Sequence, residues 1–299
     1  MGEIFIILMV ICAAISLFEP WIGVLYGYLF VVLTPQDIWW WDFSNIRATY
    51  WVLLPTSIGV MIGLLRGKFD IQILKSRRNL FILLLWMLCI ISYFAGAYIS
   101  VKSPYRFTIP AVTLSRLDKM FFLYFIACLC IDSEKKAKAL YVVMLASFAY
   151  LTYWANHQYL IGNWSGRLNG PTSITGGGIY QDQNDFAMAF VVAQPFFWFF
   201  GGTRKTKLAR WFCWLIIPLS WNAVFLTGSR GGFVGVTATI FLIAIRSRRK
   251  LLGLALIPVF FLIFLVEGGP VMTARVSGLD QYHVLALAHS PRIALDRLQ

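Results

Sequence analysis

The stretch LFILLLWMLCIISYFAGAYIS, residues 80–100, is 21 residues long and carries no charge. A helix needs about 20 apolar residues to cross a hydrocarbon core ~30 Å thick. Across the whole sequence, 59% of residues are hydrophobic and only 13% are charged. This composition excludes an ordinary soluble core, so the sequence predicts an all-α integral membrane protein.

Further apolar runs lie on both sides of this stretch. We expect spans at 51–65, 80–100, 117–131, 139–161, 183–200, 211–226, 231–245 and 251–266. The first run, 4–33, is interrupted by Glu19-Pro20, and a single helix of that length would be ~45 Å long. Two short helices are therefore favoured, with one kinked span as the alternative. The prediction is a bundle of ten transmembrane helices, or nine, in one domain over residues 1–266. An exoplasmic tail over residues 267–299 follows, which we expect to be incomplete or poorly ordered.

The basic residues gather in loops between alternate spans. Sixteen of the 26 Lys and Arg residues lie in four such loops, at 66–78, 135–138, 204–210 and 246–250. The positive-inside rule assigns these loops to the cytoplasm. The same rule places 34–50, 101–116, 162–182, the turn at Arg230 and the tail outside. The net charge of +13 is thus a topology signal with anionic membrane lipids as its partners, and it does not indicate nucleic acid.

Two polar segments fall on the predicted outer side and hold candidate binding residues. The first, 163–185, contains Arg167 and ends in QDQND, residues 181–185, directly before an apolar run. The second, TGSRGG at 227–232, places Arg230 between two apolar runs. A guanidinium presents a planar fork of donors that matches phosphate oxygens, so two arginines together suit a diphosphate. Glycines beside them let a ligand approach the backbone closely.

Simpler interpretations of the same residues remain open. Asp182 or Asn184 is suited to capping the following helix. Arg230 alternatively reaches headgroup phosphate or forms an ion pair with Asp182 or Asp185. The early segment from Asp37 to Trp51 holds four tryptophans, which favours an aromatic belt at the headgroup level over a platform for sugar rings.

These motifs together resemble those of the O-antigen ligase and polymerase superfamily. TGSRGGFVG, 227–235, looks like its Ser-Arg-Gly signature, and DQNDFA, 182–187, with Pro195 looks like its Asn-Asp helix. GRLNGP, 166–171, matches as well. The tryptophan-rich early segment and the basic loop spacing are most similar to the exosortase-associated O-glycosylation ligases. The resemblance covers about residues 1–266.

The resemblance implies a glycosyltransferase of the multi-spanning C-like ligase architecture in a bacterial inner membrane. Such an enzyme moves a glycan from an undecaprenyl diphosphate carrier to a lipid or protein acceptor on the periplasmic face. It implies no metal and no cofactor. Arg167 and Arg230 would hold the donor diphosphate, with Ser229 in the same motif. Asp182, Asn184 and Asp185 would orient sugar hydroxyls or fix the arginines.

The chain departs from the family at its C-terminal end. Relatives continue with a large exoplasmic loop that carries a histidine proposed as general base, whereas this sequence ends at Gln299. Histidine suits general base catalysis near neutral pH, and His289 is the candidate substitute. His157, near the end of its span, is expected to be an interfacial residue. In a truncated member, the donor would bind without being turned over.

Other functions are also compatible with the sequence. A polymerase differs from a ligase only in its acceptor, which is a second carrier-linked glycan. A transporter or flippase of lipid-linked saccharide would require interrupted helices and polar groups at the bilayer midplane. An inactive scaffold in an envelope assembly is the third alternative.

Overall fold

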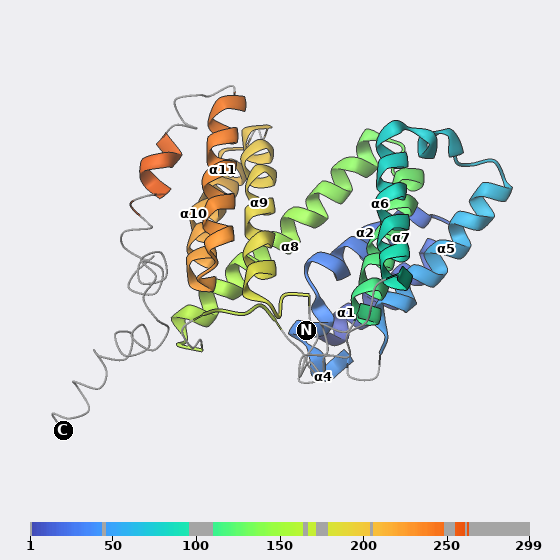
Figure 1. Ribbon diagram of the computed structural model, residues 1–299, viewed down its shortest axis with the longest axis horizontal. Helices are drawn as coiled ribbons and strands as arrows, with labels where there is room; N and C mark the ends of the chain where they lie inside the picture. Colours follow the sequence, from blue (N-terminus) through green and yellow to red (C-terminus); the bar gives the residue numbers. More distant parts are fainter. Residues whose placement is uncertain are drawn as a thin grey trace. The chain divides into compact units, whose positions relative to one another are not determined.

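The computed structural model describes residues 2–43, 46–95, 110–163, 167–171, 179–203, 206–247, 255–260 and 262. Within these ranges the elements are helices (Figure 1), as the sequence predicts. The helices pack as two compact units, one over residues 1–144 and 172–178, the other over 145–171 and 179–299. The expected tail, 267–299, lies outside the described residues.

Helices long and apolar enough to cross a membrane recur along the chain. They are α5 (Ala48–Leu65), α6 (Arg77–Ala95), α8 (Glu134–Leu160), α9 (Gln183–Thr203) and α10 (Lys207–Thr227). Each coincides with a predicted span to within a few residues at most ends. These five helices identify a helical membrane protein, while the total of ten spans, or nine, stays a prediction.

The first apolar run is broken where Glu19-Pro20 predicts a break. Helix α1 (Gly2–Ser16) has 15 residues and α2 (Pro20–Val32) has 13. Proline suits the first position of α2 because its missing N–H has no partner there in any helix. At ~1.5 Å per residue, each helix is shorter than a ~30 Å hydrocarbon core. The chain thus forms two short helices here, as favoured, and whether they cross the membrane as one span or two stays a prediction.

In the first unit, α2 packs against α1, α5 and α7 (Pro110–Cys130). The approach is close because small residues face each other: a Cβ added at Gly23 would meet Thr56, and one at Gly59 would meet the carbonyl of Ser16. Small residues allow this contact between membrane helices. Short helices complete the unit: α3 (Pro35–Ile38), α4 (Trp40–Phe43) and η1 (Ile71–Lys75).

Helix α7 of this unit differs from the predicted span in the residue at which it starts. Helix α7 starts at Pro110, seven residues ahead of the expected start at 117. Arg116, Asp118 and Lys119 therefore lie inside a helix and not at its edge. Helix α6 packs on α7 and η1, and Asn79 is its buried residue.

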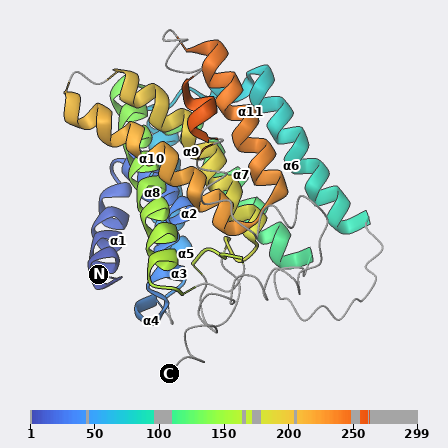
Figure 2. The ribbon, with the colours of Figure 1, turned by 90° about the vertical axis from the view of Figure 1, so that its left-hand side faces the viewer.

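The second unit is built from the end of α8, then α9, α10 and α11 (Arg230–Arg246). Helices α9, α10 and α11 lie alongside one another in both views (Figure 1, Figure 2). Gly232 of α11 packs against Ala187 of α9, and Gly235 packs against Val191. Because the residue numbers rise together, α9 and α11 run in the same direction. Their N-termini therefore lie at the same end of the unit.

Candidate functional site at the turn between α10 and α11

The turn between α10 and α11 reverses the chain within two residues. Gly228 follows the last residue of α10 in the left-handed conformation, with φ of 61°, which glycine adopts without steric cost. Ser229 is the N-cap of α11, and its Oγ accepts a hydrogen bond from the Gly232 N–H at 3.0 Å. Thr227 and Ser229 are both buried. The turn is thus a fixed corner that determines where Arg230 starts its helix.

The segment 167–171 lies against this corner. The Arg167 Nε donates to the Thr227 carbonyl at 2.8 Å, and the Leu168 N–H donates to the Leu226 carbonyl at 2.8 Å. These are carbonyls of the last turn of α10, which have no partner within the helix. A guanidinium is also favoured there by the negative end of the helix dipole. Arg167 is therefore anchored to the same corner that carries Arg230.

The start of α9 joins the corner from the other side. Asp182 precedes α9, and its Oδ1 accepts from the Asn184 N–H at 2.7 Å. The Ser229 Oγ donates to the Asn184 Oδ1 at 2.8 Å. One serine hydroxyl thus connects the N-termini of α9 and α11. Each N-terminus carries a partial positive charge, so the two together form a region that favours an anion.

The charged groups at the corner differ in their exposure and in the contacts that they make. Arg230, Asn184 and Asp185 are exposed, whereas Arg167 and Asp182 are half-buried. Within the described ranges, Arg230 makes no hydrogen bond or ion pair, so the alternative in which it pairs with Asp182 or Asp185 receives no support. The Arg230 guanidinium is available to a ligand that reaches the corner.

The structure therefore brings most of the predicted site residues together. Arg167, Asp182, Asn184, Ser229 and Arg230 meet around one turn, although they are up to 63 positions apart in the sequence. Capping by Asp182, one of the simpler interpretations, is confirmed. The role of Ser229 as the link between two helix starts was not predicted, although a serine before an apolar run is a common capping signal.

Of the two histidines considered from the sequence, one lies within the described residues. His157 is near the end of α8, where its ring lies 5.6 Å from that of Tyr153. His289 is outside the described residues, so its proposed role as general base stays a prediction. In the described part of the chain, no group of three or more His, Cys, Asp or Glu side chains is placed to hold a metal ion.

The structure contains a second polar site that the sequence analysis did not identify. Asp118 and Lys119 of α7 face a cavity of about 430 Å³ beside α5 and α6. The available signal was a pair of opposite charges at the start of the predicted span 117–131, where ionisable residues are rare. Nothing in the motif comparison above points to these two residues.

Comparisons with protein-family models, with curated proteins and with solved structures found no match.

Proposed function

We propose that this protein is a glycan ligase, which transfers a glycan from an undecaprenyl diphosphate carrier to an acceptor on the periplasmic face of a bacterial inner membrane. The observation that carries the proposal is the position of Arg167 and Arg230 beside one turn, next to the starts of α9 and α11. Two guanidinium groups and two helix N-termini match the charge of a diphosphate.

The expected chemistry follows from where charge develops. An acceptor hydroxyl oxygen forms a bond to the anomeric carbon, and the bond from that carbon to the diphosphate oxygen breaks. The hydroxyl proton goes to a base, and the electron pair of the broken bond leaves with the diphosphate. Arg230, with Arg167 beside it, stabilises that growing negative charge, which is the largest catalytic term expected here.

The general base and the contacts to the sugar are each assigned to two candidate residues. Asp182 and His289 are the candidate bases; Asp182 has one carboxylate oxygen engaged by the Asn184 N–H. Asn184 and Asp185 are exposed at the start of α9 and are suited to sugar hydroxyls.

The direction of the helices supports an outward-facing site. The corner lies at the start of α9 and α11, while Lys207 begins α10 and Arg246 ends α11 at the opposite end of the unit. By the positive-inside rule, the basic end is cytoplasmic and the corner is periplasmic.

The alternatives have less support. Helices α9 and α10 continue through Pro195 and Pro218 without interruption, whereas a transporter is expected to have broken helices at its substrate site. A polymerase would use the same corner with a different acceptor, so the acceptor decides between the two enzymes.

The test is transfer by the purified chain from undecaprenyl diphosphate oligosaccharide to a panel of lipid, protein and carrier-linked acceptors, with donor binding measured in the same samples. We expect Arg230→Ala to lower turnover about 10²–10³-fold, as loss of one charge-stabilising donor does. Arg230→Lys should also be impaired, since a point charge does not replace the fork. Arg246→Ala, at the far end of α11, is the matched control and should retain activity.

Three outcomes would contradict the proposal in different ways. Full activity of Arg230→Lys would remove the role of the fork. Donor binding without turnover on any acceptor would favour an inactive scaffold. Movement of the lipid-linked glycan across liposomes by the wild-type chain, with no transfer, would favour the transporter.

A further inference from the structure

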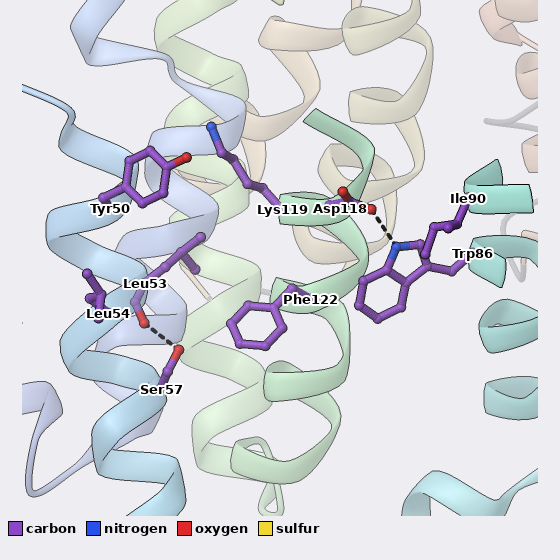
Figure 3. A pocket seen from close by; sticks show the side chains of 9 residues that line it. All are labelled: Tyr50, Leu53, Leu54, Ser57, Trp86, Ile90, Asp118, Lys119 and Phe122. Atoms are coloured by element: carbon purple, nitrogen blue, oxygen red, sulfur yellow. Dashed lines mark hydrogen bonds between the residues drawn. The ribbon is translucent and has the colours of Figure 1, made fainter. Parts of the chain in front are cut away.

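The first unit contains an open amphipathic cavity that the proposed transfer reaction does not use. It has a volume of about 430 Å³ and is bordered by α5, α6 and α7, as Figure 3 shows. This size falls within the range of about 300–1,000 Å³ that is usual for small-ligand sites. Leu53, Leu54, Ile90 and Phe122 supply most of its apolar wall. The cavity therefore suits a ligand with a substantial hydrocarbon part.

Two opposite charges face this apolar wall from adjacent positions of α7. The Asp118 Oδ1 accepts a hydrogen bond from the Trp86 Nε1 at 2.7 Å, on the α6 side. The Lys119 Nζ lies 4.8 Å from the centre of the Tyr50 ring, on the α5 side. Successive helix residues point about 100° apart, which separates the two groups, and Figure 3 shows them directed to opposite walls.

Neither charge is neutralised within the part of the chain that the structure describes. Ion pairs join Lys68 to Glu19, Lys136 to Asp132 and Lys138 to Glu134, and none involves Asp118 or Lys119. Both side chains are half-buried. A half-buried charge against an apolar wall is costly unless a partner or water satisfies it, so this pair is a candidate binding site.

The polar and apolar parts of the cavity are ordered along α5. Tyr50 lies in the first turn of α5, and Leu53, Leu54 and Ser57 follow one and two turns further into the helix. The Ser57 hydroxyl is engaged with the Leu53 carbonyl at 2.6 Å, so this deeper part presents an apolar wall. An 18-residue helix only just crosses the hydrocarbon core, so its first turn lies near the membrane interface. The charged end is thus at headgroup depth and the apolar end is at acyl-chain depth.

We propose that this cavity binds a phospholipid with a phosphate and a primary ammonium in its headgroup, namely phosphatidylethanolamine. Lys119 would contact the phosphate, the free oxygen of Asp118 would accept from the ammonium, and an acyl chain would cover Leu54 and Phe122. Both charges of the cavity are then matched by one ligand. A choline headgroup has no N–H to donate, and a glycerol headgroup has no cation. The site goes beyond glycan transfer and involves none of its residues.

The experiment uses the full chain in nanodiscs that contain equal amounts of phosphatidylethanolamine, phosphatidylcholine and phosphatidylglycerol with identical acyl chains. Native mass spectrometry counts the lipids that stay bound after the disc is released. We expect bound phosphatidylethanolamine to exceed each of the others about tenfold relative to the bulk, because charge-assisted hydrogen bonds are the strong ones.

Variants separate the two charges of the cavity. Lys119→Met should return the bound lipid to bulk composition, and Lys119→Arg should retain the enrichment. Asp118→Asn keeps an acceptor for Trp86 but loses the carboxylate, so phosphatidylethanolamine should lose its advantage over phosphatidylglycerol. Lys138→Met is the control, because the Lys138 ammonium is exposed and paired with Glu134 at 2.8 Å. Thermal unfolding of each variant in the same discs checks that it is folded.

The proposal is overturned if phosphatidylcholine is retained to the same degree as phosphatidylethanolamine, since the site would then not recognise the N–H donors of the ammonium group. Unchanged enrichment in folded Lys119→Met would also overturn it. So would displacement of phosphatidylethanolamine by a stoichiometric amount of undecaprenyl diphosphate, which would assign the cavity to the donor.

Discussion

The corner at α10–α11 and the cavity beside α5–α7 use polar residues in opposite ways. At the corner, Ser229, Asp182 and the Arg167 Nε are engaged with the ends of helices, and the buried hydroxyl of Ser229 fixes the geometry. In the cavity, the charges of Asp118 and Lys119 touch aromatic side chains and an open apolar space. The corner is held together by its own hydrogen bonds, whereas the two charges of the cavity have no counter-charge among the described residues. Preorganised groups suit a transition state, and unmatched groups suit a resident lipid.

The largest expected effect tests whether the corner and the cavity function independently. Arg230→Ala should lower glycan transfer about 10²–10³-fold and leave the composition of bound phospholipid unchanged. Lys119→Met should abolish the phospholipid enrichment and leave transfer within about twofold. Transfer assays and native mass spectrometry on the same preparations check both. A variant that alters both readouts would show that the cavity and the corner act together.

The next effect concerns how tightly the corner is packed. A Cβ added at Gly232 would lie 2.7 Å from the Ala187 Cβ, while one at Gly231 would meet the Ser229 Oγ at 4.0 Å. Gly232→Ala should therefore lower the free energy of unfolding by about 1–3 kcal/mol, as overpacking does. Gly231→Ala, one residue away, should be neutral or slightly stabilising. Unfolding in detergent measures both; equal stabilities of the two variants would contradict the close packing of α9 on α11.

The first unit offers a test by pH. Burial raises the pKa of Asp37, in α3, from 3.8 to about 7, although the positive charge of Arg116 acts to lower it. The folded state thus holds this proton more tightly than the unfolded chain, so the free energy of unfolding should fall as pH rises from about 4 to about 7. Asp37→Asn should flatten that profile and stabilise the protein at pH 8 by at least about 1 kcal/mol.

The control for this pH test carries a pKa shift of the opposite sign. A hydrogen bond from Lys138 lowers the pKa of Glu134, so this exposed carboxylate cannot cause a fall in stability as pH rises. Glu134→Gln should leave the slope unchanged. A wild-type stability that rises between pH 4 and 7 would show that Asp37 is not buried in its neutral form.

The smallest effect comes from the hydroxyl that connects two helix starts. Ser229→Ala removes the N-cap of α11 and the bond to Asn184, and should cost about 1 kcal/mol. Ser229→Thr keeps the hydroxyl and should cost less. Hydrogen exchange of the Gly232 amide reports the loss directly; no change there would mean that the cap contributes little.

Much of the fold follows from the sequence because apolar length is enough to predict helices in a membrane. The break at Pro20 was predicted from the same reasoning, since proline begins α2. The start of α7 was not, because Pro110, Thr113, Ser115 and Arg116 interrupt the apolar residues there, and the segment looks like a loop when only hydropathy is counted. A helix turn with polar residues cannot be recognised by a search for apolar runs alone.

The candidate site was predictable in part for a similar reason. Arginines flanked by glycine stand out, and Arg167 and Arg230 do lie beside the same turn. The parallel direction of α9 and α11 also agrees with the predicted topology, which places 162–182 and the Arg230 turn on the same side. The close contact of Gly232 with Ala187, across 45 positions, was not predictable. The cavity at Lys119 also depends on three helices from different parts of the chain.

Gly228 has an evolutionary consequence that follows from its backbone alone. Its φ of 61° disfavours any residue with a Cβ, whereas a Cβ there would lie 3.4 Å from the Cγ and the Nε of Arg167, at ordinary van der Waals distance. Asparagine is the first substitution open to this position, because asparagine tolerates the left-handed conformation. Among diverging descendants, position 228 should therefore hold glycine or asparagine whatever residue stands at position 167.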